Sequence, residues 1–299
     1  FALSYLISPY YVNGDPKIYS IVYENLKNLD FIEASIYYVI ALSSKEIIHF
    51  LLSWTASKFI EKNLFISIIN AFLGYITLLL FDKWKYNKIL AILFVTTNFY
   101  MIVLYFAAER LKFAYIFLIL AILNAKKTKK LYLYLSLTLF SHLSTILFLG
   151  SYFLTLFTNK IKKIVFKGKL SKKLFLIISI SLITGILLKS HLVAKISDYN
   201  LINQISIFNF TKITILSLII LYLKPQTKII ISLIPFLIGI FLVGDDRINM
   251  FVFTILIYFS SFKNKGLNIP TILLIIYFSL QGILFVINII TIGNGFIIS

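Results

Sequence analysis

Apolar runs of 15 to 22 residues, separated by short polar or lysine-rich segments, fill most of the chain. A helix needs about 20 mostly apolar residues to cross a bilayer. A strand of a membrane barrel would instead show about 10 residues of alternating polarity, whereas these runs are continuous. The pattern therefore predicts an all-α polytopic integral membrane protein, with about 9 to 11 membrane helices of which some are short or re-entrant.

Lysine clusters between the apolar runs predict the orientation of the helices. Basic residues concentrate in cytoplasmic loops, so each apolar block between two clusters should leave the cytoplasmic side and return to it. The outer turns then fall at residues 109–110 and 244–247, and the polar stretch 10–45 lies outside the membrane. The clusters are residues 83–88, 126–130, 160–173, 224–228 and 263–265.

The stretch 46–82 does not fit the pattern in which each apolar block leaves the cytoplasmic side and returns to it. Residues 46–60 are apolar enough to cross, which places residues 61–63 at the cytoplasmic side, and residues 64–80 form a further apolar run. The lysines that follow this run also require the cytoplasm. One of the two spans is therefore expected to be short or re-entrant.

The block 131–157 is long for one helix and short for two. Because both of its ends are rich in lysine, it favours a short hairpin with Ser141 and His142 near the tip over a single tilted span.

The opening FALSYLIS is interpreted as the tail of a first membrane helix, inside which the sequence begins. With only 5 Pro and 11 Gly, no long linker is expected, and residues 1–299 are predicted to form one domain.

Composition supports the membrane interpretation and excludes several classes of function. Of 299 residues 60% are hydrophobic and 13% are charged, whereas soluble domains have about 25% charged residues. The net charge of +18 would suit a nucleic-acid binder only if the basic residues formed a face on a soluble body, so we expect no nucleic-acid partner. The absence of cysteine excludes disulfides and thiolate metal sites.

The two arginines are the strongest chemical signal. Arg110 and Arg247 are the only arginines among 29 basic residues, and each follows acidic residues at a predicted outer turn. A lysine serves equally well as a topological charge, but the planar guanidinium grips a phosphate with paired hydrogen bonds. We expect both arginines to converge on one diphosphate, with Glu109, Asp245 and Asp246 orienting them. The alternative is that each arginine is a structural ion pair.

Further polar residues are candidates for catalysis or sugar binding. His142 has a side chain suited to proton transfer near neutral pH, although an isolated histidine is more often a satisfied residue inside a bundle. Asp15, Tyr19 and Tyr23 are spaced by four and should share one helix face, where the tyrosines contact sugars or merely pack. Glu46 begins an apolar helix, a position where a carboxylate ordinarily only favours the helix dipole.

As an ordered set, four short motifs resemble those of the EpsG/Wzy-type bacterial polysaccharide polymerases. They are GDPKIY from Gly14 to Tyr19 with Tyr23 following, SSKE at residues 43–46, ERLKFA at residues 109–114 and FSHLST at residues 140–145. The resemblance covers roughly residues 10 to 150.

The resemblance implies a GT-C-like membrane glycosyltransferase of the bacterial inner membrane. Such an enzyme joins oligosaccharide repeat units carried on undecaprenyl diphosphate at the outer face of that membrane, towards the periplasm or the cell exterior, and so lengthens an O-antigen, a capsule or an exopolysaccharide. It needs no metal or other cofactor, and a flippase and a chain-length regulator are its expected partners. In this family context Arg110 and Arg247 would stabilise the diphosphate leaving group, His142 or Asp15 would act as the base, and Tyr19 and Tyr23 would contact sugars.

Two other classes of function remain open from the sequence. A flippase for lipid-linked oligosaccharides also needs cations against diphosphate, although it should show paired repeats and a charged central cavity. An O-antigen ligase or a membrane acyltransferase would also use a histidine in a membrane block.

Overall fold

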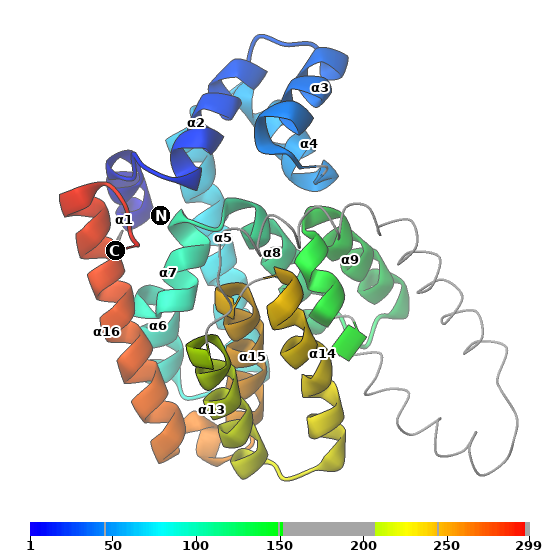
Figure 1. Cartoon of the computed structure of the whole chain (residues 1–299), viewed down its shortest axis with the longest axis vertical. Coiled ribbons are helices and arrows are strands. Elements are labelled where there is room, and N and C mark those ends of the chain that lie inside the picture. The colour runs from blue at the N-terminus through cyan, green and yellow to red at the C-terminus, as the bar shows by residue number, and fades with distance from the viewer. Residues whose placement is uncertain (45, 149, 152–206, 244, 297–299) are drawn as a thin grey trace, which may run out of the picture. The chain divides into compact units, whose positions relative to one another are not determined.

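The computed structural model describes residues 1–44, 46–148, 150–151, 207–243 and 245–296. These residues form helices, and no strand occurs among them (Figure 1). The described chain divides into a first unit, Phe1–Thr145 with Ser261–Ser299, and a second unit, Ile146–Ser260. The expectation of a single domain stays a prediction.

The first unit contains short helices near the N-terminus and longer ones from α5 onward. In chain order they are α1 (Ala2–Ile7), η1 (Ser8–Tyr10), α2 (Asp15–Leu26), α3 (Phe31–Leu42), α4 (Ile47–Ser57), α5 (Lys62–Lys83), α6 (Lys88–Thr97), α7 (Phe99–Phe106), α8 (Glu109–Leu123), α9 (Thr128–Ser141), η2 (Leu143–Thr145), η3 (Asn264–Gly266) and α16 (Ile269–Ile292). The second unit contains α13 (Ile207–Leu223), α14 (Thr227–Val243) and α15 (Asp245–Ser260), which pack against one another.

Two described helices are long and apolar enough to cross a membrane. They are α5 and the segment Asn264–Ile292, and the bent pair α6 and α7 makes a third if it counts as one span. Several other apolar helices, α3 and α4 among them, have only 10 to 17 residues. With 11 residues, α4 is roughly 16 Å long, about half the 30 Å of a hydrocarbon core. The prediction that one segment of the stretch 46–82 is short is therefore confirmed, and the short one is α4.

Helices α2, α3 and α4 pack together through one apolar cluster (Figure 1). Its buried members are Val22, Leu26, Ala34, Tyr38 and Phe50. The helix α3 starts at a capping interaction, because the Asp30 side chain accepts a hydrogen bond from the backbone N–H of Glu33 and so satisfies a donor that the helix leaves open.

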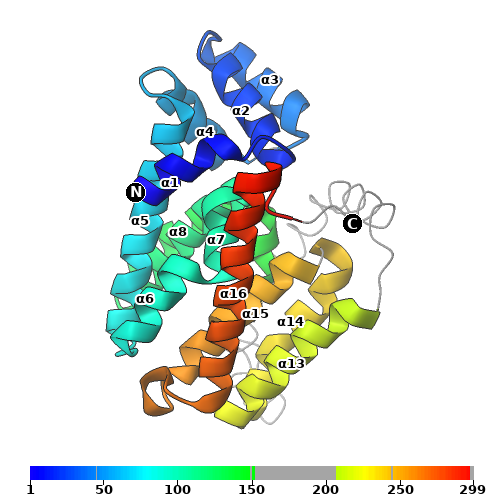
Figure 2. The ribbon, with the colours of Figure 1, turned by 90° about the vertical axis from the view of Figure 1, so that its left-hand side faces the viewer.

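The bend between α6 and α7 is built around a buried asparagine. The two helices meet at 43°, and the Asn98 side chain accepts from the backbone N–H of Tyr100 to cap α7. Helix α16 runs along both helices (Figure 2). Gly282 lies so close to the break that a Cβ there would collide with the backbone oxygen of Thr97. A small residue is required at this crossing because the two backbones touch.

Three lysine clusters share one end of the first unit, as the alternation predicts. The Lys83 ammonium donates to the carbonyl oxygens of Ile122 and Leu123 at the end of α8 (2.6 and 3.0 Å), next to the cluster 126–130. The backbone N–H of Asn87 donates to the carbonyl oxygen of Lys265 (2.9 Å). We call this the lysine end. The cluster 160–173 lies outside the described residues.

The opposite end of the first unit, which we call the site end, holds the predicted outer turn. Helix α7 ends at Phe106 and α8 begins at Glu109, so the chain turns at residues 107–108, immediately before the predicted residues 109–110. Helix α9 ends at Ser141, and the chain turns through η2, as expected for a hairpin tip. His142 lies at this same end, 3.6 Å from Glu46.

The prediction that residues 61–63 and residues 109–110 lie on opposite sides is wrong. The Lys62 ammonium lies 3.3 Å from the Glu109 carboxylate, so both belong to the site end. The rule that lysines mark the cytoplasm failed here because Lys62 is buried in an ion pair with an acid, and so is not a solvated topological charge. Within the stretch 46–82, α5 then connects the site end to the lysine end, whereas α4 stays near the site end.

Candidate functional site

Polar and charged side chains from five helices and one turn meet at the site end of the first unit. Most of them are buried, although isolated charges are rarely found inside proteins. They are Tyr19 on α2, Tyr38 on α3, Glu46 and His49 at the start of α4, Lys62 on α5, Glu109 and Arg110 on α8, and His142 after α9.

The chain enters α2 through a glycine conformation that brings Tyr19 to the site. Gly14 has φ 71° and ψ −153°, a region open essentially only to glycine. Asp15 and Pro16 then begin the helix, where an acid and a proline are both favourable. Tyr19 follows one turn later and is buried, whereas Asp15 is exposed.

Glu46 and His142 both occupy non-helical positions at helix ends. Glu46 is the N-cap residue of α4, with φ −80° and ψ 91°, but its side chain makes no capping hydrogen bond. His142 follows α9 in an extended conformation, with φ −161° and ψ 125°. The Glu46 side chain therefore makes only tertiary contacts, whereas the His142 side chain is held by Ser144 and faces Glu46.

Arg110, Glu46, His142 and Tyr19 form one half of the cluster, which we call the arginine half. Arg110 Nη1 lies 3.2 Å from Glu46 Oε2, and His142 Nε2 lies 3.6 Å from Glu46 Oε1. Arg110 Nε donates to the Tyr19 hydroxyl (2.9 Å). The Arg110 side chain is 16% exposed, and within the described chain its Nη2 has no hydrogen-bond partner. Part of its guanidinium is therefore available to a ligand.

Glu109, His49, Lys62 and Tyr38 form the other half, which we call the glutamate half. Glu109 Oε1 lies 3.2 Å from His49 Nε2, and Glu109 Oε2 lies 3.3 Å from Lys62 Nζ. The Tyr38 hydroxyl lies 2.8 Å from His49 Nδ1. Because a carboxylate only accepts, His49 donates from Nε2, and in the neutral ring Nδ1 accepts a hydrogen bond from the Tyr38 hydroxyl. Every member of this half therefore has a partner.

Helices α4 and α8 are joined by a crossed pair of contacts between the two halves. Glu46 and His49 are three residues apart and share one face at the start of α4. Glu109 and Arg110 are adjacent on α8, yet Glu109 contacts His49 while Arg110 contacts Glu46. Two neighbouring residues of α8 thus belong to different halves of the cluster.

Tyr19 belongs to the arginine half and also contacts the glutamate half. Its ring centroid is 5.7 Å from the Arg110 guanidinium carbon and 5.6 Å from Lys62 Nζ, distances that permit cation–π attraction. Burial raises the pKa of the Tyr19 hydroxyl to about 12, while the charge of Arg110 acts in the opposite direction. The phenol therefore keeps its proton at neutral pH, so it can accept from Arg110 and still donate to a ligand.

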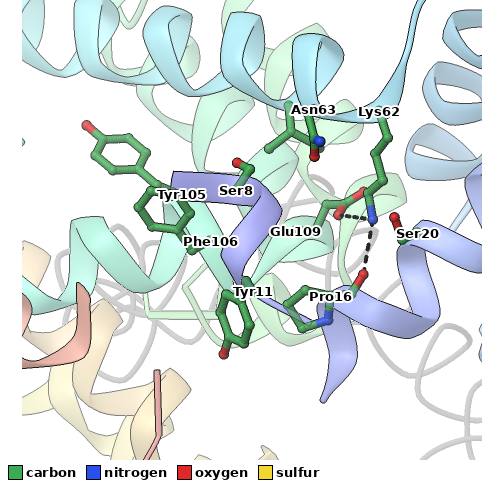
Figure 3. A pocket seen from close by; sticks show the side chains of 10 residues that line it. Ser8, Tyr11, Pro16, Ser20, Lys62, Asn63, Tyr105, Phe106 and Glu109 are labelled. Atoms are coloured by element: carbon green, nitrogen blue, oxygen red, sulfur yellow. Dashed lines mark hydrogen bonds and ion pairs between the residues drawn. The ribbon is translucent and has the colours of Figure 1, made fainter. Parts of the chain in front are cut away.

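A small pocket of about 50 Å³ opens beside the glutamate half (Figure 3). It is large enough for a few water molecules or one hydroxyl-bearing group of a ligand. Figure 3 shows Lys62 Nζ between the Glu109 carboxylate and the carbonyl oxygen of Pro16, with Ser20 beside it. The lining combines aromatic rings, hydroxyls, an amide and this ion pair: Ser8, Tyr11, Pro16, Ser20, Lys62, Asn63, Ile66, Tyr105, Phe106 and Glu109.

Of the residues singled out from sequence, the structure brings Arg110, Tyr19 and His142 together around Glu46. Glu109 is adjacent to Arg110 in the chain but contacts His49 and Lys62, and Glu46 occupies the position beside the guanidinium that we expected for Glu109. The alternative of a structural ion pair for Arg110 is thus met in part, since Glu46 is its partner.

Two other predicted residues lie at the edge of the cluster. Tyr23 is buried, donates to the carbonyl oxygen of Ile60 (3.0 Å) and stacks on Phe65, an arrangement typical of packing. Asp15 is exposed at the start of α2. Its role as a base and the sugar-binding roles of Tyr19 and Tyr23 stay predictions.

Arg247 lies in the second unit, in the first turn of α15, and is partly buried. The side chains of Asp245 and Asp246 lie outside the described part of the chain. The convergence of Arg110 and Arg247 on one ligand stays a prediction.

Sequence reasoning missed Glu46, His49, Lys62 and Tyr38 as members of the site. One signal was available: Glu46 and His49 are three residues apart at the start of an otherwise apolar helix, which places both on one face. Nothing local distinguishes Lys62 from a loop lysine, because its burial depends on Glu109, a residue 47 positions later in the numbering.

No protein-family model matches the sequence, and no curated protein or solved structure shows detectable similarity to it. The resemblance to the polysaccharide polymerases therefore depends on the four motifs alone.

Proposed function

We propose that this chain is a polysaccharide polymerase that transfers oligosaccharide repeat units from undecaprenyl diphosphate to an acceptor repeat unit. One observation carries the proposal. Each of the four motifs that resemble the polymerase family contributes a side chain to a single cluster: Tyr19, Glu46, Arg110 and His142. Motifs that matched only by chance would have no reason to meet in space.

In this proposal the chain forms a GT-C-like bundle of about 9 to 11 membrane helices in the bacterial inner membrane. The site end faces the periplasm and the lysine end faces the cytoplasm, in keeping with the preference of lysine for that side. The substrate is a lipid-linked oligosaccharide, and a flippase and a chain-length regulator would act beside the enzyme.

Arg110 would stabilise the negative charge that grows on the diphosphate as it leaves. Its partly exposed guanidinium has Nη2 open, and Tyr19 holds Nε in place, so the group is oriented before the substrate arrives. Preorganised charge of this kind often makes the largest single contribution to catalysis. Arg247 is proposed to act on the same diphosphate.

The test is a product assay with purified protein in liposomes, supplied with a labelled undecaprenyl-diphosphate repeat unit. We expect a ladder of polymers from the wild type. Arg110→Lys and Arg247→Lys should each lose the ladder, because lysine keeps the charge but not the bidentate geometry. Lys129→Arg, at an exposed lysine of the lysine end, is the matched control and should keep it.

The same assay separates the competing functions. Single capped units indicate a ligase and acetylated sugar indicates an acyltransferase, whereas movement of intact substrate across the bilayer without any product indicates a flippase. Ladders of wild-type length from both arginine variants would contradict the proposed role of the arginines.

A further inference from the structure

Glu46 is the most unusual carboxylate of the site end. Its side chain is 8% exposed, and neither of its oxygens receives a hydrogen bond that meets ordinary geometry from the described chain. Arg110 Nη1 and His142 Nε2 lie within ion-pair distance, at 3.2 and 3.6 Å, but are not aligned as donors. Two buried acceptor oxygens thus lie beside a guanidinium and an imidazole and still lack an aligned donor.

An unsatisfied buried acceptor is costly, about 1–3 kcal/mol and more for a charged group, and most buried polar groups have a partner. Glu46 could have been satisfied locally, because it is the N-cap residue of α4, but it makes no capping bond. Its oxygens are instead held beside Arg110, next to the open Nη2. This arrangement fits a ligand that brings a hydroxyl donor to Glu46 and an anion to Arg110.

His142, the base expected from sequence, is arranged differently. Its Nδ1 accepts from the backbone N–H of Ser144 (3.2 Å), and the Ser144 hydroxyl lies 2.7 Å away. A backbone N–H can only donate, so Nδ1 carries no proton and the neutral ring is protonated at Nε2, the nitrogen that faces Glu46. The nitrogen able to accept a proton is therefore already engaged and turned away from Glu46.

The remaining candidate acceptors are also occupied or remote. Both oxygens of Glu109 face cationic or donor groups on His49 and Lys62. Asp15 is exposed on α2, and no described contact joins its side chain to Arg110. Among the residues that the structure describes, Glu46 alone combines burial, acceptor oxygens without an aligned donor and contact with the guanidinium.

We propose that Glu46 is the catalytic base that takes the proton of the acceptor sugar hydroxyl. The hydroxyl oxygen forms a bond to the anomeric carbon of the donor, the bond from that carbon to the diphosphate oxygen breaks, and the diphosphate leaves with the electron pair. The hydroxyl proton passes to Glu46, whose carboxylic acid later returns it to the departing diphosphate. His142 is a positioning residue, with Nε2 facing Glu46 Oε1 at 3.6 Å. This inference rests on the proposed function and extends it to the acceptor.

The decisive variant is Glu46→Gln, which keeps size and polarity but cannot accept the proton. A general base contributes about 10²–10⁴-fold, so kcat for polymer formation should fall by that factor. The KM for the lipid-linked donor should change by less than about threefold, since binding is largely preserved. Glu33→Gln, at an exposed carboxylate of α3, is the control and should behave like the wild type.

The pH profile distinguishes a base from a structural residue. Activity of the wild type should fall on the acid side as the base becomes protonated, and this acid limb should disappear in the residual activity of Glu46→Gln. The groups that face or lie near Glu46 and could contribute to the limb are Arg110 from α8, His142 after α9, Tyr38 from α3 and His49 on α4. A limb that remains in Glu46→Gln and vanishes in His142→Gln would overturn the inference in favour of the histidine.

If Glu46→Gln does not accumulate in folded form, Glu46→Asp decides the question. It keeps the acid at a shorter reach, so polymer should still form at a reduced rate with a shifted acid limb. A profile identical to that of the wild type would overturn the inference. A wild type that makes no polymer refutes the proposed function, whereas full activity of Glu46→Gln beside an inactive Arg110→Lys refutes only the role of Glu46.

Discussion

Glu46 and Glu109 are two buried carboxylates of the same cluster, and they differ in one respect. Each lies against a histidine and a cation, and the two have similar side-chain exposure, 8% and 7%. Glu109 faces His49 with one oxygen and Lys62 with the other, at 3.2 and 3.3 Å. The oxygens of Glu46 have neighbours at comparable distances but no aligned donor.

The difference teaches how to separate a structural charge from a functional one. A buried ion pair that satisfies all its atoms contributes to holding helices together but offers nothing to a ligand. A buried charge that lacks hydrogen-bond partners costs free energy. This cost is offset only where a bound ligand supplies the missing hydrogen bonds. We therefore assign the glutamate half to structure and the arginine half to chemistry.

The largest effect expected from this division is on stability. Glu109→Ala leaves Lys62 and His49 without their partner, and breaking a buried pair from one side costs about 3–5 kcal/mol. We expect a marked fall in the melting temperature in detergent, followed by the fluorescence of Trp54 and Trp84, or a failure to accumulate. Glu33→Ala is the control. A stability loss for Glu46→Ala as large as that for Glu109→Ala would remove the distinction between the halves.

A smaller effect is expected from the tyrosine that contacts both halves. Tyr19→Phe removes the acceptor for Arg110 Nε, and a hydrogen bond to a charged group contributes about 1.5–3 kcal/mol. Polymer formation should fall by about tenfold or more, as measured by initial rates in liposomes. Tyr23→Phe is matched in residue type and helix, but its hydroxyl bonds Ile60, so it should keep its activity. Equal losses in both variants would indicate a packing role for Tyr19.

The smallest effect is expected for His142→Gln. If His142 only positions Glu46, the amide can take its place and activity should fall by no more than about tenfold, whereas loss of a general base would cost about 10²–10⁴-fold. Initial rates at saturating donor measure the difference. A loss at the upper end of that range would assign the proton transfer to the histidine.

Much of the fold of the first unit could be predicted from the chain. The turn before α8 followed from the charged pair at residues 109–110 inside a long apolar block, and the end of α9 followed from the length of its block. The meeting of the lysine clusters 83–88, 126–130 and 263–265 followed from their preference for one side. The position of Lys62 at the site end could not be predicted, because a lysine looks the same in the sequence whether its ammonium is solvated or buried in an ion pair.

The sequence predicted several residues of the site but not which of them contact one another. Arg110 and His142 were identifiable because arginine and histidine are rare in this chain, and Tyr19 because it follows Asp15 at a spacing of four. The partner of Arg110 was not, since Glu109 is its neighbour in sequence, whereas Glu46 is brought to it by the packing of α4 on α8. On a helix, adjacent residues point in directions about 100° apart, so sequence neighbours are poor guides to side-chain contacts.

The sequence alone determined the apolar, helical character of the chain, the meeting of three lysine clusters at one end of the first unit and the position of the arginines near predicted turns, because these depend on residue type and spacing. The packing of α2, α4, α8 and α9 decided which carboxylate is satisfied and which is open. That outcome depends on distances between residues as many as 123 positions apart, such as Tyr19 and His142, and no local preference encodes it.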